Sequence, residues 1–151
     1  MNILGHSWIA VNATLGKRYL LIIGSLLPES FPFIENNPFS FGEIHEGGEK
    51  LFAFLNKNYP HKHDLALGML AHGVKFGADG FNKYIESYAT DKKETLLREI
   101  AKSSGVNLKT AECRLHNFLW WAVDVWILKE YPGFAREVQK TIRRVDIKEI
   151  S

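Results

Sequence analysis

The stretch LALGMLAHGVKFGADGFNKYIE, residues 65–86, decides how the rest of this chain is arranged. Its first half is apolar on every face of a helix, and such a helix is normally buried by other helices. One histidine and one aspartate, His72 and Asp79, stand in this apolar stretch. A buried polar group without a partner costs roughly 1–3 kcal/mol. The stretch therefore predicts a buried central helix with a polar centre around His72 and Asp79.

Polar residues that could pair with His72 and Asp79, directly or through a metal ion, are found in the rest of the chain. They are His6, Glu29, His45, Glu112, His116 and Asp124. Imidazole nitrogens and carboxylate oxygens suit zinc, iron or manganese. In a continuous helix, His72 and Asp79 share one face but lie about 10.5 Å apart along the axis, which is long for two ligands of one ion. A bulge or break at Gly73, Gly77 or Gly80 would shorten this gap.

Apolar residues recur with helical spacing along most of the remaining chain. We expect helices over residues 4–15, 44–58, 92–102, 108–130 and 134–145. The apolar run at residues 18–27 fits a strand or a buried helix, and we favour a helix because no partner strand is visible elsewhere. Residues 28–42 form the one long irregular segment, which is typical of a lid or a site wall. The expected fold is all-α: one domain over residues 1–151, arranged as a multi-helix bundle.

Several residues have the chemistry of helix caps. Asp64 is the expected N-cap of the central helix, and Asn107 that of the last long helix. Asp91 and Glu94 have the form of a capping box, and Gly105 is placed to end the helix that they open. The helix that Asn107 opens is expected to belong to the core, because it carries Trp120, Trp121, Trp126 and Leu128.

The composition describes one well-packed globular domain: 151 residues, 46% of them hydrophobic and 13% aromatic. The formal net charge of +2, spread over scattered lysines and arginines, is too small to indicate a nucleic-acid partner. A single cysteine, Cys113, excludes an internal disulfide and fits a reducing compartment. No stretch has the ~18 consecutive apolar residues of a membrane helix, and no signal peptide is evident. We therefore expect a soluble, cytoplasmic protein.

An ordered series of motifs runs through about four-fifths of the chain. In sequence order it consists of HSWIAVNA starting at His6, GSLLPE ending at Glu29, His45, LGMLAHG containing His72, Asp79 and His116. Together these motifs resemble the zinc-dependent phospholipase C family, an all-α group that also includes S1/P1-type nucleases. The order and the surroundings of the motifs carry the resemblance, because no single motif is highly specific.

The resemblance implies a metal-dependent phosphodiester hydrolase, because the zinc cluster of that family binds the substrate phosphate and activates water. Residue by residue, it implies the metal ligands His6, Glu29, His45, His72, Asp79 and His116. We expect one or two zinc ions, with manganese or iron in place of zinc as the other possibilities. One ion would be held by Glu29, His45, His72 and Asp79, and a second would be brought by His6. Asp79 or Glu29 would orient the attacking water or act as its general base.

Two departures from the family pattern leave a second interpretation open. The late histidine of the family is normally followed four residues on by glutamate, and here that position is Trp120, for which Glu112 or Asp124 would have to substitute. No histidine occurs between Asp79 and His116, so one family ligand is missing. The second interpretation is a family member that has lost its activity and kept the scaffold as a binding protein.

Three further segments bear on the substrate and on less favoured functions. The phenylalanine-rich residues 31–41 would form an apolar wall for a small-molecule, lipid or nucleotide phosphodiester. The dipeptide His63–Asp64 would suit an HD-type phosphohydrolase, although it opens a helix where such a pair belongs within one. Residues 97–115 resemble a helix-turn-helix, but the helix that follows is too apolar for a major groove. We expect no stable nucleic-acid complex.

Overall fold

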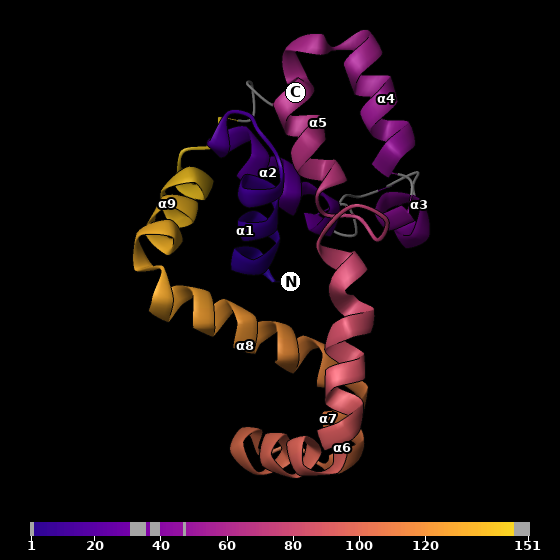
Figure 1. The fold of residues 1–151 in the computed structure, drawn as a ribbon, viewed down its shortest axis with the longest axis vertical. Coiled ribbons are helices and arrows are strands. Elements are labelled where there is room, and N and C mark those ends of the chain that lie inside the picture. The colour runs from indigo at the N-terminus through magenta and orange to yellow at the C-terminus, as the bar shows by residue number, and fades with distance from the viewer. Residues whose placement is uncertain (1, 31–35, 37–39, 47, 147–151) are drawn as a thin grey trace.

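The computed structural model describes residues 2–30, 36, 40–46 and 48–146. Helices make up most of this part of the chain and no strand occurs in it, so the predicted all-α fold is confirmed (Figure 1). None of the described helices combines the length and hydropathy that crossing a bilayer requires. Past residue 30, most of the expected irregular segment lies outside the described residues.

Three helices form the centre of the fold: α1 (Ile3–Ala13), α2 (Arg18–Ser30) and α5 (His63–Leu70). The predicted choice of helix for residues 18–27 is therefore confirmed. Helix α9 (Pro132–Arg143) covers α1 and α2 on the side away from α5 (Figure 1). The buried cluster that joins these elements consists of Ala10, Val11, Leu21, Ile22, Ala71, Ile127, Phe134 and Val138.

Helices α2 and α5 touch through their backbones at two glycines. A Cβ on Gly24 would stand 2.2 Å from the carbonyl oxygen of Leu65, and a Cβ on Gly68 would stand 2.4 Å from that of Leu21. Any larger residue at these positions would force the helices apart. This close approach brings the residues after α5 against the C-terminal half of α2.

The expected continuous helix over residues 65–86 is wrong. Helix α5 ends at Leu70, a turn follows, and the chain continues as the 3₁₀ helix η3 (Ala78–Phe81) and then α6 (Asn82–Ser104). The reason is a glycine in the turn: a Cβ on Gly77 would stand 2.1 Å from the carbonyl oxygen of Ala71. The chain folds back at this point, which a straight helix cannot do.

Two expected helix starts are also wrong. Asp64 lies in the first turn of α5, because the 3₁₀ helix η2 (Pro60–Lys62) leads directly into α5 with Lys62 as its N-cap. The Asp64 carboxylate instead accepts a hydrogen bond of 3.1 Å from the backbone N–H of Lys17. Asp91 lies inside α6, and Glu94 pairs with Arg98 one turn later.

The expected cap residues of the following turn are confirmed. Gly105 ends α6 in the left-handed conformation, with φ of 67°. Asn107 caps α7 (Leu108–Cys113), and its side chain accepts a hydrogen bond of 2.8 Å from the N–H of Thr110.

Residues 44–58 fall in α3 (Phe41–Glu46) and α4 (Gly48–Asn58), and residue 47 lies outside the described residues. The expected helix over residues 108–130 is divided into two. Residues 108–130 belong to α7 and α8 (Leu115–Glu130), with Arg114 between them.

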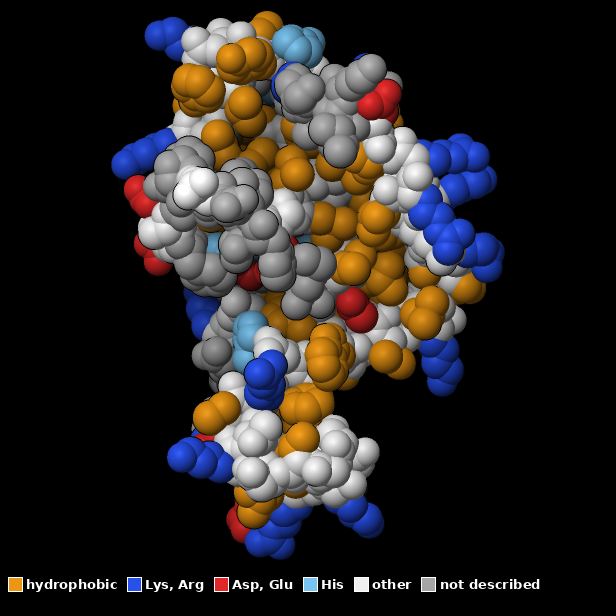
Figure 2. Space-filling model, turned by 180° about the vertical axis from the view of Figure 1, so that it is seen from behind, with side chains coloured by type: hydrophobic (Ala, Val, Ile, Leu, Met, Phe, Trp, Pro, Cys, Tyr) orange, Lys and Arg blue, Asp and Glu red, His pale blue; other side chains and the backbone are white. Residues whose placement is uncertain are grey.

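Helix α8 is not the core helix that its tryptophans predict. Trp120 is buried, whereas the side chains of Trp121, Trp126 and Leu128 are about half exposed. The reason lies in the topology: α6 and α7 lead away from the centre, and α8 crosses back with one face against α1 (Figure 1). Figure 2, which views the molecule from behind, shows hydrophobic side chains at the surface over the middle of the molecule.

The glycine contact between α2 and α5 predicts the stability of one variant. Gly68→Ala should lower the free energy of unfolding by about 1–3 kcal/mol, because the added methyl overpacks a backbone contact. The measurement is urea unfolding followed by circular dichroism. Gly133→Ala is the matched control, since its Cβ would meet no atom within 4 Å, and its stability should be equal or slightly higher. Equal stability of both variants would contradict the close contact.

Candidate metal centre

Five of the six predicted ligands meet at one place in the fold. They come from separate elements: His6 from α1, Glu29 from α2, His45 from α3, and His72 and Asp79 from the two sides of the turn after α5. All but His72 line a cavity of about 410 Å³, and the side chain of His72 is fully buried. The predicted convergence of these five residues is present in the structure.

The ring of His72 is oriented by the backbone of α2. Its Nδ1–H donates a hydrogen bond of 2.8 Å to the carbonyl oxygen of Ser25, which leaves Nε2 as an acceptor. Burial, with repulsion from His6 next, lowers the pKa of His72 to about 4, so the ring is neutral near pH 7. Within the described part of the chain, its buried Nε2 has no hydrogen-bond partner. It lies 3.5 Å from Oδ2 of Asp79 and 3.8 Å from Oε1 of Glu29.

The turn after α5 brings Asp79 beside His72, although the two are seven positions apart in the sequence. The backbone N–H of Asp79 donates to the carbonyl oxygen of His72 at 3.0 Å, and that of Ala78 donates to Ala71 at 2.9 Å. The sequence allows a break at its glycines, and this break shortens the distance between His72 and Asp79. The N–H of Val74 in the same turn donates to the carbonyl oxygen of His45 at 3.2 Å, which ties α3 to the site.

The distances between the ligand atoms fit a shared cation better than hydrogen bonds. Nε2 of the buried His45 lies 3.7 Å from Oδ2 of Asp79 and 3.9 Å from Oε1 of Glu29. These separations exceed ordinary hydrogen bonds. Tetrahedral zinc with bonds of about 2.0–2.1 Å would place its ligands about 3.4 Å apart. The ligand atoms form two sets of three among the described residues, each close enough to share one cation: His6, Glu29 and His72, and His45, His72 and Asp79.

His6 approaches the other oxygen of Asp79. Its Nδ1–H donates to the carbonyl oxygen of Asn2 at 2.6 Å. Its Nε2 lies 3.4 Å from Oδ1 of Asp79. With Nδ1–H donating to Asn2, Nε2 is the ring nitrogen that faces Oδ1 of Asp79 and could bind a cation. Asp79 thus presents one oxygen to His6 and the other to His45 and His72.

The electrostatics of the site favour a cation. Contact with His45 lowers the pKa of Glu29, although burial opposes the shift. Burial alone would raise the pKa of Asp79, but the contact with His6 and the neighbouring rings lower the pKa overall. Both carboxyl groups are therefore ionised near pH 7, beside a neutral His72 ring. Two negative charges in a half-buried cavity attract a divalent ion.

The remaining candidate ligands are not part of the cluster. His116 lines the cavity, but its ring nitrogens lie outside the ligand sets found among the described residues, which are His6, Glu29 and His72, and His45, His72 and Asp79. The exposed Glu112 pairs with Lys93 on α6. Asp124 accepts a hydrogen bond of 2.8 Å from the N–H of Gly5 at the start of α1. Neither Glu112 nor Asp124 substitutes for the missing glutamate, because each is engaged elsewhere.

Two positioning residues, Trp120 and Asn2, are not identified by the sequence reasoning. Trp120 stacks on His6 with ring centroids 5.6 Å apart, and its indole N–H donates to Asn82 at 2.7 Å. Asn2 accepts from the N–H of Gly5 at 2.7 Å as the N-cap of α1, and its amide donates to the carbonyl oxygen of Trp120. An asparagine just before an expected helix is a capping signal that could have identified Asn2.

The segments that would suit an HD-type phosphohydrolase or a helix-turn-helix protein lie away from the cluster. His63 is exposed, with Nδ1 2.6 Å from Oδ1 of Asn56, and the Asp64 carboxylate bonds to Lys17, so this dipeptide contributes nothing to the cluster. In the helix-turn-helix segment, the second helix α7 has six residues. Comparisons of the chain with models of known families, with curated proteins and with solved structures found no match.

The geometry of the cluster predicts that zinc uptake depends on His45 of α3. Chelator-treated protein should bind at least one equivalent of zinc in calorimetry. Zinc at 100 times its Kd should stabilise the fold by about 2.7 kcal/mol, which raises the Tm by about 5–10 °C. His45→Ala should lose this shift. The exposed His61→Ala is the control and should keep it. Equal shifts in both variants, or no zinc uptake by the parent protein, would contradict the assignment.

Proposed function

We propose that this chain is a metal-dependent phosphodiester hydrolase, with its centre formed by His6, Glu29, His45, His72 and Asp79. One observation carries the proposal: the buried Nε2 of His72 has no hydrogen-bond partner among the residues that the structure describes, and it faces two carboxylates across 3.5 and 3.8 Å. The ordered motifs that resemble the zinc-dependent phospholipase C family support it. We propose zinc, as one or two ions, or manganese or iron in its place.

The side chains divide into holding and orienting roles. Glu29, His45, His72 and Asp79 would hold the first ion, and His6 with Oδ1 of Asp79 would contribute to a second. The divalent metal would supply charge neutralisation at a phosphoryl oxygen and a lower pKa for a water molecule. The carbonyl groups of Ser25 and Asn2 keep the protons of His72 and His6 on Nδ1. The lone pair on each Nε2 can then bind a metal ion.

Glu29 would hold the ion through Oε1, the oxygen nearest His45 and His72, and we assign its other carboxylate oxygen as the general base. Its side chain is 26% exposed, whereas that of Asp79 is 12% exposed and lies between three imidazole rings. The lowered pKa of Glu29 keeps it ionised and able to accept a proton from water near pH 7. Asp79 would act mainly by holding the metal and fixing the direction of the His6 ring.

The cavity wall suits a small phosphodiester with an apolar part. Trp121 and Val74 contribute apolar surface, and Asn82 and Asn117 contribute amide groups. We propose a lipid or nucleotide phosphodiester as the substrate class. Most of the phenylalanine-rich segment expected to form a further wall lies outside the described residues.

One observation favours a second candidate function. Trp120 occupies the position of the glutamate expected from the family pattern, and it packs on His6 without contributing a ligand. The second candidate is therefore a metal-holding binding protein without hydrolytic activity.

Hydrolysis of bis-p-nitrophenyl phosphate distinguishes the two candidates. Zinc-loaded protein should hydrolyse this ester, and Glu29→Gln should lower kcat at least about 100-fold, the usual scale for loss of a general base. Glu99→Gln, which removes an exposed carboxylate on α6, is the matched control and should keep its rate within about twofold. Zinc content is measured on every sample. Zinc-loaded protein that hydrolyses no faster than chelated protein would rule out the hydrolase and leave the binding protein.

A further inference from the structure

A second hollow, of about 850 Å³, lies between α2 and α9. It shares no residue with the lining of the metal cavity. Its volume falls within the range of small-molecule sites, about 300–1,000 Å³. We call it the basic groove, after the cationic residues on α9 and just beyond it: Arg136, Lys140, Arg143 and Arg144.

The cations of the basic groove have no acidic partners within the described part of the chain. The nearest carboxylate on α9, Glu137, is held by Arg18 through two hydrogen bonds of 2.8 and 2.9 Å. Four cations and two carboxylates, Glu137 and Asp146, line the groove, which gives 4 − 2 = +2. The formal net charge of the whole chain is also +2, so the positive excess of the protein is concentrated here.

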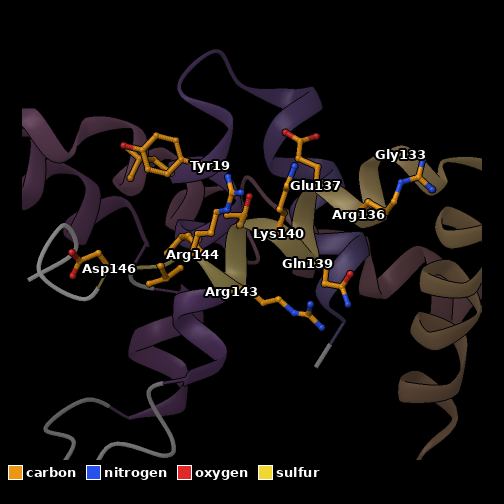
Figure 3. Close-up of a pocket in the computed structure, with 13 residues that line it drawn as sticks. Tyr19, Gly133, Arg136, Glu137, Gln139, Lys140, Arg143, Arg144 and Asp146 are labelled. Carbon is orange, nitrogen blue, oxygen red and sulfur yellow. The ribbon is translucent and has the colours of Figure 1, made fainter.

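The opposite wall of the basic groove is aromatic and apolar. Tyr19 from α2 is 47% exposed and stands beside Leu20 and Ile23. Figure 3 shows Tyr19 from α2 among the lining residues together with Lys140, Arg143 and Arg144. The basic groove thus pairs a ring surface with guanidinium and ammonium groups, which bind phosphate oxygens.

Helix stability explains only part of this arrangement. Lys140 and Arg143 lie in the last turn of α9, where positive charge complements the helix dipole. The helix dipole does not explain the presence of Arg144, which lies beyond the end of α9. It also does not explain why an exposed tyrosine lines the same groove. We propose that the basic groove binds a phosphate ester carried on a planar ring, as in a nucleotide. The phosphate would contact Lys140 and Arg144, and the ring would stack on Tyr19.

Binding of adenosine 5′-monophosphate, measured by calorimetry on the full chain, tests the proposal. The monophosphate should bind more tightly than inorganic phosphate and than adenosine, because only it uses both walls. Lys140→Ala/Arg144→Ala should weaken the binding at least tenfold, and Tyr19→Ala should reduce it to the level of inorganic phosphate. Lys50→Ala/Lys57→Ala, which removes two exposed charges from α4, is the matched control and should bind as the parent does.

Parallel titrations with and without zinc separate the basic groove from the metal centre. Binding at the basic groove should be the same in zinc-loaded and in chelated protein. Loss of binding when zinc is chelated would overturn the proposal. Equal weakening of binding by Lys140→Ala/Arg144→Ala and by the control Lys50→Ala/Lys57→Ala would overturn it too. No binding of the monophosphate at millimolar concentration would overturn it as well. Equal affinity for inorganic phosphate and for the monophosphate would overturn the stacking role of Tyr19.

Discussion

The hydrogen bond from His72 to the carbonyl oxygen of Ser25 is the interaction on which the rest of the candidate centre depends. It forms because Gly24 and Gly68 let α2 and α5 approach until their backbones touch. The bond turns the other ring nitrogen of His72 toward Glu29 and Asp79, in a place that water does not reach. A neutral, fully buried imidazole with an unsatisfied nitrogen is costly, and coordination of a metal ion would remove that cost. Helix packing and site chemistry are thus linked at one residue.

The fold class is predictable from the sequence, because the spacing of apolar residues and the caps Gly105 and Asn107 are local signals. Prediction fails where tertiary contacts override local ones. The break after Leu70 depends on a backbone approach at Gly77, and the exposure of Trp121 and Trp126 depends on the path of α6 and α7. The glycines of this stretch allow a break, but the local pattern does not show that the chain folds back there. The path of α6 and α7 has no signature in the local pattern of α8, because it is set by elements distant in the sequence.

For the candidate centre, the residue types and their order are sufficient to predict five side chains that meet. The geometry is not predictable, because backbone carbonyl groups orient the rings of His6 and His72, and a carbonyl group carries no sequence signal. His116 and Asp124 are plausible ligands by type. Asp124 instead accepts a hydrogen bond from the backbone N–H of Gly5 in the first turn of α1, and His116 lines the cavity outside the ligand sets among the described residues. Cap and ligand roles use the same side-chain chemistry, so only the fold separates them.

A cation between the imidazoles and carboxylates of this cluster is the central claim. Anomalous scattering at the zinc edge, from crystals soaked in zinc, tests it most directly. We predict a strong peak within bonding distance of His45, His72, Glu29 and Asp79. Zinc peaks only at surface histidines, with the cluster unchanged and without density between its ligand atoms, would contradict the claim.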